Sequence, residues 1–172
     1  MSRNNHWDLI VVGGGAAGFF AAIACAEASG GRVLIVEKTP NLLGKVKISG
    51  GGRCNVTHAC FEPKPLTAHY PRGEKSLIGP FHRWGAADTV EWFESRGVTL
   101  KTESDGRMFP ITDSSQTVID CLTKAARDAG VVIKVSTGVN SITVHEDGCF
   151  DLTTAKAETF TANAVLLATG GT

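Results

Sequence analysis

The sequence predicts an α/β fold built on a parallel β-sheet, and two observations carry this prediction. An apolar run over residues 8–12 ends in three glycines, and an Ala-rich segment over residues 16–28 without proline follows it. A second apolar run over residues 32–36 then ends at Glu37. An apolar run, a helical segment and a second apolar run make a βαβ unit of about thirty residues, the size that such a unit needs.

The composition is that of an ordinary globular domain. The 172 residues are 42% hydrophobic and 20% charged, which suggests one domain over residues 1–172. Lys plus Arg and Asp plus Glu number 17 each, so no net charge attracts the chain to nucleic acid or to an anionic membrane. No apolar run approaches the ~20 residues of a membrane helix, and residues 1–7 lack a signal-peptide pattern. We therefore expect a cytoplasmic protein with a small-molecule substrate, of open oligomeric state.

The cysteine pattern argues against both disulfides and a metal site. The five cysteines are an odd number without close pairing, which is typical of reduced thiols. Cys54, His58 and Cys60 are close in sequence, but no Cys-x-x-Cys pair and no fourth ligand accompany them. We predict no metal site, and we expect Cys54 to be a small buried side chain rather than a redox thiol.

A long excursion separates the βαβ unit from the rest of the domain. Residues 39–112 are expected to form a glycine-rich loop with a helical part, and the stretch 39–85 shows little periodicity. Within the excursion, residues 86–96 predict a helix and residues 98–101 a short strand. The elements expected after it are a helix through Ala129 that opens with a capping box at 113–116, a strand at 131–135, a β-meander over 138–161 around the turn Asp147-Gly148, and a last apolar strand at 163–168.

Gly13, Gly15 and Gly18 match the G-x-G-x-x-G fingerprint of dinucleotide-binding proteins in the context that it requires. They follow a strand and open a helix, and Glu37 stands 19 positions beyond the last glycine. Gly13 allows the turn, Gly15 allows a pyrophosphate to approach, and Gly18 allows helix and strand to pack closely. Glu37 would accept hydrogen bonds from ribose hydroxyls and repel a 2′-phosphate, which favours FAD or NAD over NADP.

Other segments of the predicted sheet are expected beside this turn. A helix N-terminus at Ala16 and Ala17 favours an anion, and Lys38 follows Glu37 at the carboxyl end of its strand. The meander followed by Ala168-Thr169-Gly170-Gly171 looks like an FAD-binding domain of the glutathione-reductase type. In that Rossmann-like fold, a turn such as Thr169-Gly170 lies beside FAD, and the backbone at a position such as Val139 contacts the adenine.

Three stretches together point to one family. They are Leu43 to His58, with Ser-Gly-Gly-Gly-Arg-Cys-Asn at positions 49–55, Asp105 to Pro110, and Ala168 to Gly171. They closely resemble the bacterial aminoacetone-oxidase-like or BaiN-like (YhiN) family of FAD-dependent flavoproteins, and the resemblance covers essentially the whole chain. Ser-Gly-Gly-Gly-Arg-Cys-Asn is specific to that family, whereas the fingerprint and the last glycine turn are shared by many FAD proteins.

The resemblance implies that the loop passes near the flavin end of FAD. The residues of this region that it places at the cofactor are Gly44, Ser49, Gly51, Arg53, Cys54 and Asn55. Arg53 and Asn55 are the side chains expected to touch cofactor or substrate, and Arg107 is a third catalytic candidate that would pair with a substrate carboxylate. The alternatives are a surface cation for Arg53, a turn former for Asn55, and a structural salt bridge for Arg107.

The leading interpretation is an FAD-dependent oxidoreductase of unknown substrate, with NADH or NADPH considered as its electron donor. Two alternatives remain open: a non-catalytic dinucleotide-binding module or inactive fragment, and an NAD-dependent dehydrogenase, which would leave the loop at 49–55 without a role. Members of the family continue well beyond the length of this chain. We therefore expect an FAD-binding domain that is truncated at its C-terminus and inactive by itself.

Overall fold

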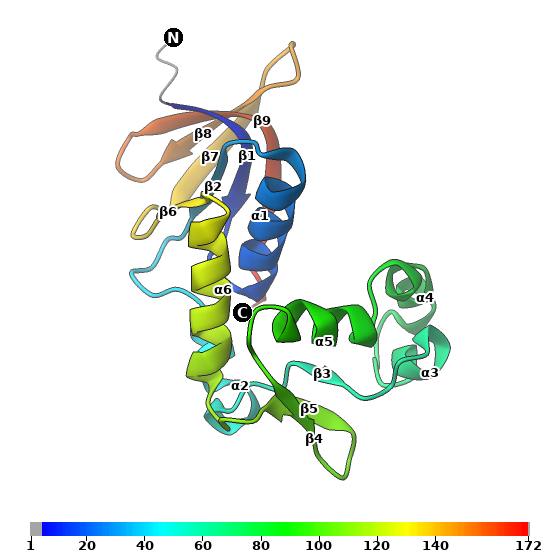
Figure 1. Ribbon diagram of the computed structural model, residues 1–172. Helices are drawn as coiled ribbons and strands as arrows, with labels where there is room; N and C mark the ends of the chain where they lie inside the picture. Colours follow the sequence, from blue (N-terminus) through cyan, green and yellow to red (C-terminus); the bar gives the residue numbers. More distant parts are fainter. Residues whose placement is uncertain (1–4, 172) are drawn as a thin grey trace. The chain divides into compact units, whose positions relative to one another are not determined.

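The computed structural model describes residues 5–171, and the chain divides into two compact units, each with its own β-sheet (Figure 1). The first unit combines Met1–Lys45 with Leu122–Thr172, and the second is Val46–Cys121. Among the helices described, none is long and apolar enough to cross a membrane.

The first unit is built on a six-stranded sheet in the order β6-β2-β1-β9-β8-β7. Strands β6, β2, β1 and β9 run parallel, whereas β7, β8 and β9 form the antiparallel meander. This is the α/β Rossmann-like arrangement that the sequence predicts. The strands are β1 His6–Val12, β2 Val33–Val36, β6 Val132–Lys134, β7 Val139–Val144, β8 Phe150–Thr154 and β9 Thr159–Leu167.

Strand β9 belongs to both parts of the sheet, which corrects one expectation. The meander expected over 138–161 and the strand expected at 163–168 were treated as separate, but one continuous strand, Thr159–Leu167, belongs to both. Phe160 pairs with Leu152 in the antiparallel register, and Ala164 pairs with Leu9 in the parallel register. No turn residue interrupts the stretch, so β9 pairs with β8 through residues 159–162 and with β1 through residues 161–167.

Helix α1, Ala16–Ser29, packs on β1 and β2. It buries Phe19, Ala22 and Ile23, and it ends where Gly30 takes the left-handed conformation at φ 63°. Small residues on α1 let the helix approach the sheet closely. Because α1 begins at Ala16, its N-terminus lies at the glycine turn after β1.

Helix α6, Ser115–Asp128, begins differently from the sequence prediction. The expected capping box at 113–116 is wrong, because the Asp113 carboxylate forms an ion pair with Lys101 and the Gln116 side chain donates to Asp120 at 2.8 Å. The Gln116 backbone N–H instead donates to the Ser114 hydroxyl at 3.3 Å. The ion pair between Asp113 and Lys101 therefore replaces the capping box that was expected at the start of α6.

The second unit contains an antiparallel sheet in the order β3-β5-β4, the helices α3, α4 and α5, and parts of α2 and α6. The expectation of an irregular stretch at 39–85 is corrected, because it contains α2, β3, α3 and α4. The sequence hides the two longer helices, because Pro80 lies inside α4 and the non-helical Ser49, Gly50 and Gly51 lie inside α2. Their bounds and those of the rest of the unit are α2 Gly44–Gly52, β3 Thr57–His58, α3 Pro63–Thr67, α4 Glu74–Arg83, α5 Ala86–Glu94, β4 Leu100–Thr102 and β5 Arg107–Pro110.

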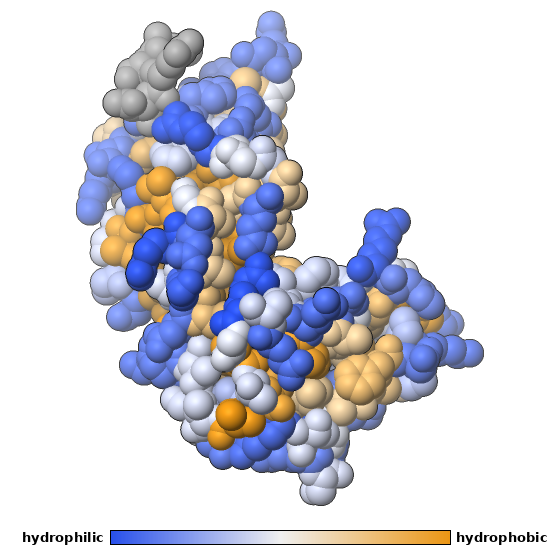
Figure 2. Space-filling model, in the orientation of Figure 1, coloured by the Kyte–Doolittle hydropathy of each residue, from blue (hydrophilic) through white to orange (hydrophobic). Residues whose placement is uncertain are grey.

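Each unit keeps its core away from solvent while leaving some apolar side chains at the surface. Ile10 and Leu34 in the first unit and Phe109 in the second are fully buried. Figure 2 shows hydrophilic side chains interspersed with apolar ones over the face that it presents. Scattered apolar side chains of this kind are normal for a globular protein.

Candidate cofactor-binding site

The fingerprint turn is packed too tightly for side chains at two of its glycines. A Cβ at Gly18 would lie 2.0 Å from the Gly13 carbonyl oxygen, and one at Gly13 would lie 2.4 Å from the Ala168 carbonyl oxygen. Gly13 also has a φ of 120°, which L side chains rarely adopt. A Cβ at Gly15, in contrast, would meet no atom of the described residues within 4 Å. The turn therefore joins helix and strand closely and leaves room at Gly15 for a ligand.

At the N-terminus of α1, no side chain of the described residues accepts a hydrogen bond from the first backbone N–H groups. Gly15 occupies the N-cap position, no side chain caps the helix, and its first turn contains no acidic residue. Ala16 and Ala17 are exposed. The first N–H groups of a helix have no acceptor within the helix, and the helix dipole is positive there. This end of α1 therefore fits a pyrophosphate.

Glu37 is held at the carboxyl end of β2 by three hydrogen bonds. Its carboxylate accepts the Gly14 backbone N–H at 2.8 Å, the Thr39 backbone N–H at 2.8 Å and the Thr39 hydroxyl at 2.9 Å. Burial alone would raise the pKa of Glu37, but these hydrogen bonds outweigh it and the pKa is lowered. A carboxylate has about four lone-pair positions, so Glu37 retains one acceptor position beyond these three hydrogen bonds.

The segment before β7 lies directly against the end of β2. The Thr137 backbone N–H donates to the Glu37 carbonyl at 2.8 Å, and the Ser136 backbone N–H donates to the Thr39 carbonyl at 3.0 Å. A Cβ at Gly138 would lie 3.4 Å from the Cβ of Lys38. Val139, which begins β7 beside this contact, is half-buried. The structure thus brings Lys38 and the Val139 backbone together with Glu37.

The second glycine turn lies beside the first. The Ala168 backbone N–H donates to the Val12 carbonyl at 2.8 Å, and Thr169 and Gly170 follow in exposed positions. Lys45, which the sequence analysis did not select, donates from its ammonium group to the Gly171 carbonyl. Nothing in the local sequence around Lys45 signals this contact, since the two residues lie 126 positions apart.

A further contact extends the turn region to the start of α2. The Leu43 backbone N–H donates to the Gly14 carbonyl at 2.8 Å, so the exposed Gly44 follows directly after a residue bound to the fingerprint. Gly14 itself was also missed: a Cβ there would lie 2.7 Å from the Leu42 side chain and 3.1 Å from the Glu37 Cβ. A side chain at Gly14 would therefore separate the fingerprint from Glu37.

In the second unit, the loop at 49–55 turns sharply at its glycines. Ser49 is extended, and Gly50 and Gly51 are both left-handed, with φ of 56° and 68°. A Cβ at Gly50 would lie 2.9 Å from the Phe109 ring. The Cys54 backbone N–H closes the loop by donating to the Ser49 carbonyl at 3.0 Å. The loop backbone is thus folded onto itself over a buried aromatic ring.

Arg53 and Arg107 share one carboxylate and one aromatic ring. Arg53 forms an ion pair with Glu103, whose other oxygen lies 3.6 Å from an Arg107 nitrogen. The guanidinium carbon of Arg53 lies 4.1 Å from the centre of the Phe109 ring, and that of Arg107 lies 5.4 Å from it. Asp105 pairs with Arg107 at 2.7 Å. The hydrogen bond with Glu103 raises the pKa of Arg53 above its ordinary value, so Arg53 is a fixed cation.

The other two side chains of the loop also have partners. With its amide nitrogen turned toward β3 and β5, Asn55 donates to the Thr57 carbonyl at 2.8 Å and to the Met108 carbonyl at 3.1 Å. Its amide oxygen remains as an acceptor. Cys54 is buried, and burial raises the pKa of its thiol, although a hydrogen bond with Ser49 opposes the shift. A neutral thiol is a poor nucleophile, in keeping with a packing role for Cys54.

The selected residues therefore form two groups, one in each unit. The first unit gathers Gly13, Gly15, Ala16, Ala17, Gly18, Glu37, Lys38, Gly44, Val139, Thr169 and Gly170 around the two glycine turns. The second unit contains Ser49, Gly51, Arg53, Cys54, Asn55 and Arg107.

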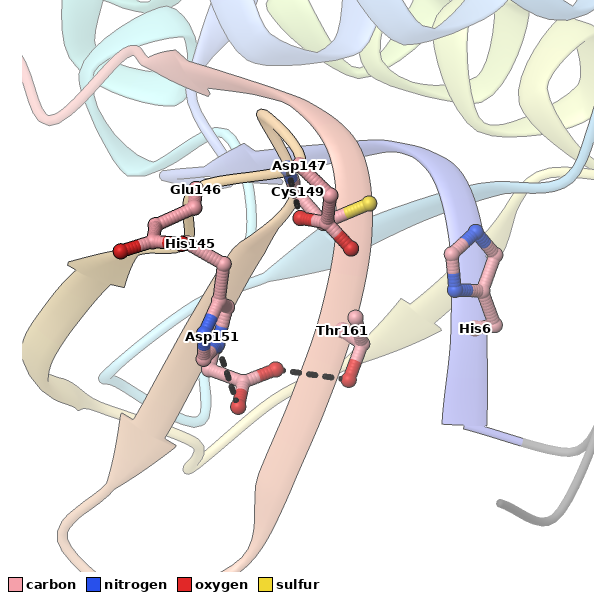
Figure 3. Close-up of a pocket in the computed structure, with 7 residues that line it drawn as sticks. All are labelled: His6, His145, Glu146, Asp147, Cys149, Asp151 and Thr161. Atoms are coloured by element: carbon pink, nitrogen blue, oxygen red, sulfur yellow. Dashed lines mark hydrogen bonds and ion pairs between the residues drawn. The ribbon is translucent and has the colours of Figure 1, made fainter.

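A pocket of about 540 Å³ lies elsewhere, on the meander of the first unit (Figure 3). It is lined by His145 and Asp151, whose side chains pair at 2.9 Å, and by Thr161, which donates to Asp151 at 2.7 Å. Glu146 and Asp147 add further negative charge. An acidic pocket repels a pyrophosphate, so the glycine turns are the better dinucleotide site.

A parallel sheet with two glycine turns at its carboxyl ends, an uncapped helix N-terminus and an acidic residue after the second strand define a dinucleotide-binding domain. Comparison with known proteins narrows this class. The chain belongs to the family of the HI0933-like protein Rossmann domain, whose model matches residues 7–172.

Two curated relatives match nearly the whole of this chain. The chain is 31% identical to the ribosomal RNA dihydrouridine synthase of Escherichia coli over 96% of its length and 40% of that protein. It is 30% identical to the 3-dehydro-bile acid delta(4,6)-reductase of Clostridium scindens over 94% of its length and 38% of that protein. The chain thus spans about two fifths of the length of these curated relatives.

Solved structures agree on the fold. A flavocytochrome c3 fumarate reductase has a TM-score of 0.71 and 26% identity over 98% of this chain and 34% of that one. The 3-ketosteroid-delta4-(5alpha)-dehydrogenase of Rhodococcus jostii also has a TM-score of 0.71, with 18% identity over 99% and 47% of the two chains. The cofactor of this domain is FAD, as the sequence analysis predicted, and the relatives are FAD-dependent oxidoreductases. The interpretation as an NAD-dependent dehydrogenase is not supported.

Proposed function

We propose that the protein is an FAD-dependent oxidoreductase that adds hydrogen to a carbon–carbon double bond beside a carbonyl or carboxyl group, or that removes hydrogen from the corresponding saturated bond. The observation that carries the proposal is the chemistry shared by the relatives' names. Uridine, which is saturated to dihydrouridine, a 3-dehydro bile acid with delta(4,6) unsaturation and fumarate each contain a double bond of this kind. The substrates differ in size and polarity, so the reacting bond is what they have in common.

The residues of the first unit would hold the cofactor. The N–H groups at Gly15, Ala16, Ala17 and Gly18 would bind the pyrophosphate, and the remaining acceptor position of Glu37 would bind the adenosine ribose. Around them, Lys38 and Val139 would border the adenosine, and Gly44, Thr169 and Gly170 would border the rest of the dinucleotide. Bound FAD supplies the redox chemistry by exchanging a hydride with the substrate.

The loop at 49–55 would lie near the flavin end of FAD, where the substrate reacts. Adding a hydride to such a double bond puts negative charge on the adjoining oxygen, and a fixed cation beside that oxygen stabilises the charge. Arg53 is a fixed cation, and the N–H groups of Ser49 and Gly51 and the amide of Asn55 add polar groups along the same loop. Arg107 would contribute a second positive charge, whereas Cys54 would pack beneath the loop.

Balanced charge favours a small-molecule substrate over a nucleic acid, since Lys plus Arg equal Asp plus Glu at 17 each. The five free cysteines support a location in the reducing cytoplasm. NADH or NADPH would supply electrons when the reaction runs as a reduction.

The test is a reoxidation experiment with the FAD-loaded protein expressed from its whole gene. Anaerobically reduced protein is mixed with a 3-keto-delta4 steroid, fumarate, or a uridine-containing ribosomal RNA fragment, and flavin absorbance is followed while products are identified by mass. Reoxidation by a small compound, with formation of its saturated product, supports the proposal. Reoxidation by the RNA fragment alone would overturn the small-molecule part. No reoxidation by any of them would overturn the proposed reaction.

A further inference from the structure

Glu103 stands at the centre of the charged cluster in the second unit. One of its carboxylate oxygens pairs with Arg53 and the other lies 3.6 Å from Arg107, so a single side chain spans both guanidinium groups. The Glu103 side chain is 28% exposed, less than those of Arg53 at 33% and Arg107 at 46%. It is the more enclosed member of the ion pairs that it makes.

The backbone around Glu103 fixes where its carboxylate lies. Its N–H donates to the Arg107 carbonyl at 2.8 Å, and its carbonyl accepts the Gly106 N–H at 2.9 Å, which closes the turn between β4 and β5. Its side chain therefore starts from a defined point of the hairpin. Arg53, in contrast, follows three consecutive glycines, which supply little conformational restraint.

The ring of Phe109 completes the arrangement. It is fully buried, and the Arg53 guanidinium lies over it at 4.1 Å. A cation above an aromatic ring is attracted to it, but the attraction does not set the direction of the guanidinium plane. A carboxylate oxygen that accepts a hydrogen bond from one guanidinium nitrogen does, because a hydrogen bond is directional, and Glu103 accepts such a bond from Arg53.

We propose that Glu103 is a positioning residue, which orients Arg53 over Phe109 and thereby holds the loop at 49–55 in its working conformation. This inference rests on the proposed role of that loop at the reacting end of FAD. Two other carboxylates are less able to orient Arg53. Asp113 lies 3.7 Å from Arg53 and is paired with Lys101, and the ion pair of Asp105 is with Arg107. The proposal gives Glu103 no contact with cofactor or substrate.

The test compares two variants that remove the same charge from the same hairpin. Glu103→Gln loses the ion pair with Arg53, whereas Asp105→Asn has no contact with Arg53 to lose. In each FAD-loaded protein, alkylation of Cys54 by iodoacetamide is followed by peptide mass spectrometry, and the midpoint potential of FAD is measured. Neither measurement needs a substrate, so a failure of the proposed reaction does not affect them.

In Glu103→Gln we expect Cys54 to react about fivefold faster, the factor that corresponds to losing roughly one kcal/mol of loop stability. We also expect the FAD potential to shift in Glu103→Gln and to stay near the wild-type value in Asp105→Asn. Equal shifts in the two variants would indicate only a through-space charge effect and would overturn the proposal. Faster alkylation of Cys54 at an unchanged FAD potential would show that Glu103 only stabilises the loop. That result would also overturn the proposal.

Discussion

The carboxylate of Glu37 accepts the backbone N–H of Gly14 at 2.8 Å, which ties the end of the second strand to the fingerprint turn. An acidic residue at this position is usually regarded as a ligand for ribose hydroxyls. Here the same side chain also satisfies a donor of the turn and two donors of Thr39. Glu37 therefore shapes the site in addition to any contact with the cofactor.

Replacing Glu37 by Ala should weaken FAD binding by about 1–3 kcal/mol, the scale of a charge-assisted hydrogen bond. The Gly14 and Thr39 donors would lose their acceptor, and the ribose would lose its partner. Titration of the apoprotein with FAD, followed by flavin fluorescence, measures the change. Glu146→Gln, at an exposed hairpin position, is the matched control and should bind as the wild type does. An unchanged affinity for FAD in Glu37→Ala would show that Glu37 only ends the strand and does not contribute to binding.

Gly18→Ala should destabilise the fold as well as the site. The added Cβ would lie 2.0 Å from the Gly13 carbonyl oxygen, a backbone atom that cannot swing aside. We expect the free energy of unfolding to fall by about 1–3 kcal/mol, as for other overpacked positions, with reduced FAD occupancy. Urea denaturation of the apoprotein measures the first effect, and FAD released on denaturation measures the second.

Gly15→Ala is the informative partner of that variant. Its Cβ would meet no atom of the described residues within 4 Å, so the apoprotein should keep its stability. FAD affinity should nevertheless fall, because the methyl group would occupy the space proposed for the pyrophosphate. Two variants with the same stability loss would show that Gly15 serves packing and not ligand approach.

The pocket on the meander should make stability depend on acid pH. Hydrogen bonds from Thr161 and then from His145 lower the pKa of Asp151. A carboxyl whose pKa is lower in the folded state contributes stability that is fully present above its unfolded pKa of about 3.9 and is lost as the pH falls through the lowered value. Asp151→Asn should flatten the decline of unfolding free energy below that pH. An unchanged acid limb in Asp151→Asn would exclude this pair as its cause.

The sequence predicted the elements that depend on local chemistry. The βαβ unit is visible because the glycines follow one apolar run and precede another, and the hairpin is visible because Asp147-Gly148 favours a tight turn. Strand β5 was missed, because its four residues include Pro110 and follow the turn pair Asp105-Gly106, which is typical of a loop. The role of Glu103 was missed because its partner Arg53 lies 50 positions away, and only the folded hairpin brings the two together.

Arg53→Gln tests the proposed reaction most directly. The glutamine amide lacks the positive charge and the fork of donors, so it cannot stabilise negative charge that develops on a carbonyl oxygen. Removing one such donor typically lowers kcat by about 10²–10³-fold. We expect a loss on this scale in the turnover of whichever double-bond substrate the wild type accepts. FAD occupancy should fall much less than turnover, because Arg53 is not among the residues around the two glycine turns. Lys64→Gln, at an exposed position of α3 in the same unit, is the control and should turn over normally. Wild-type kcat in Arg53→Gln would mean that its ion pair with Glu103 serves only the stability of the loop.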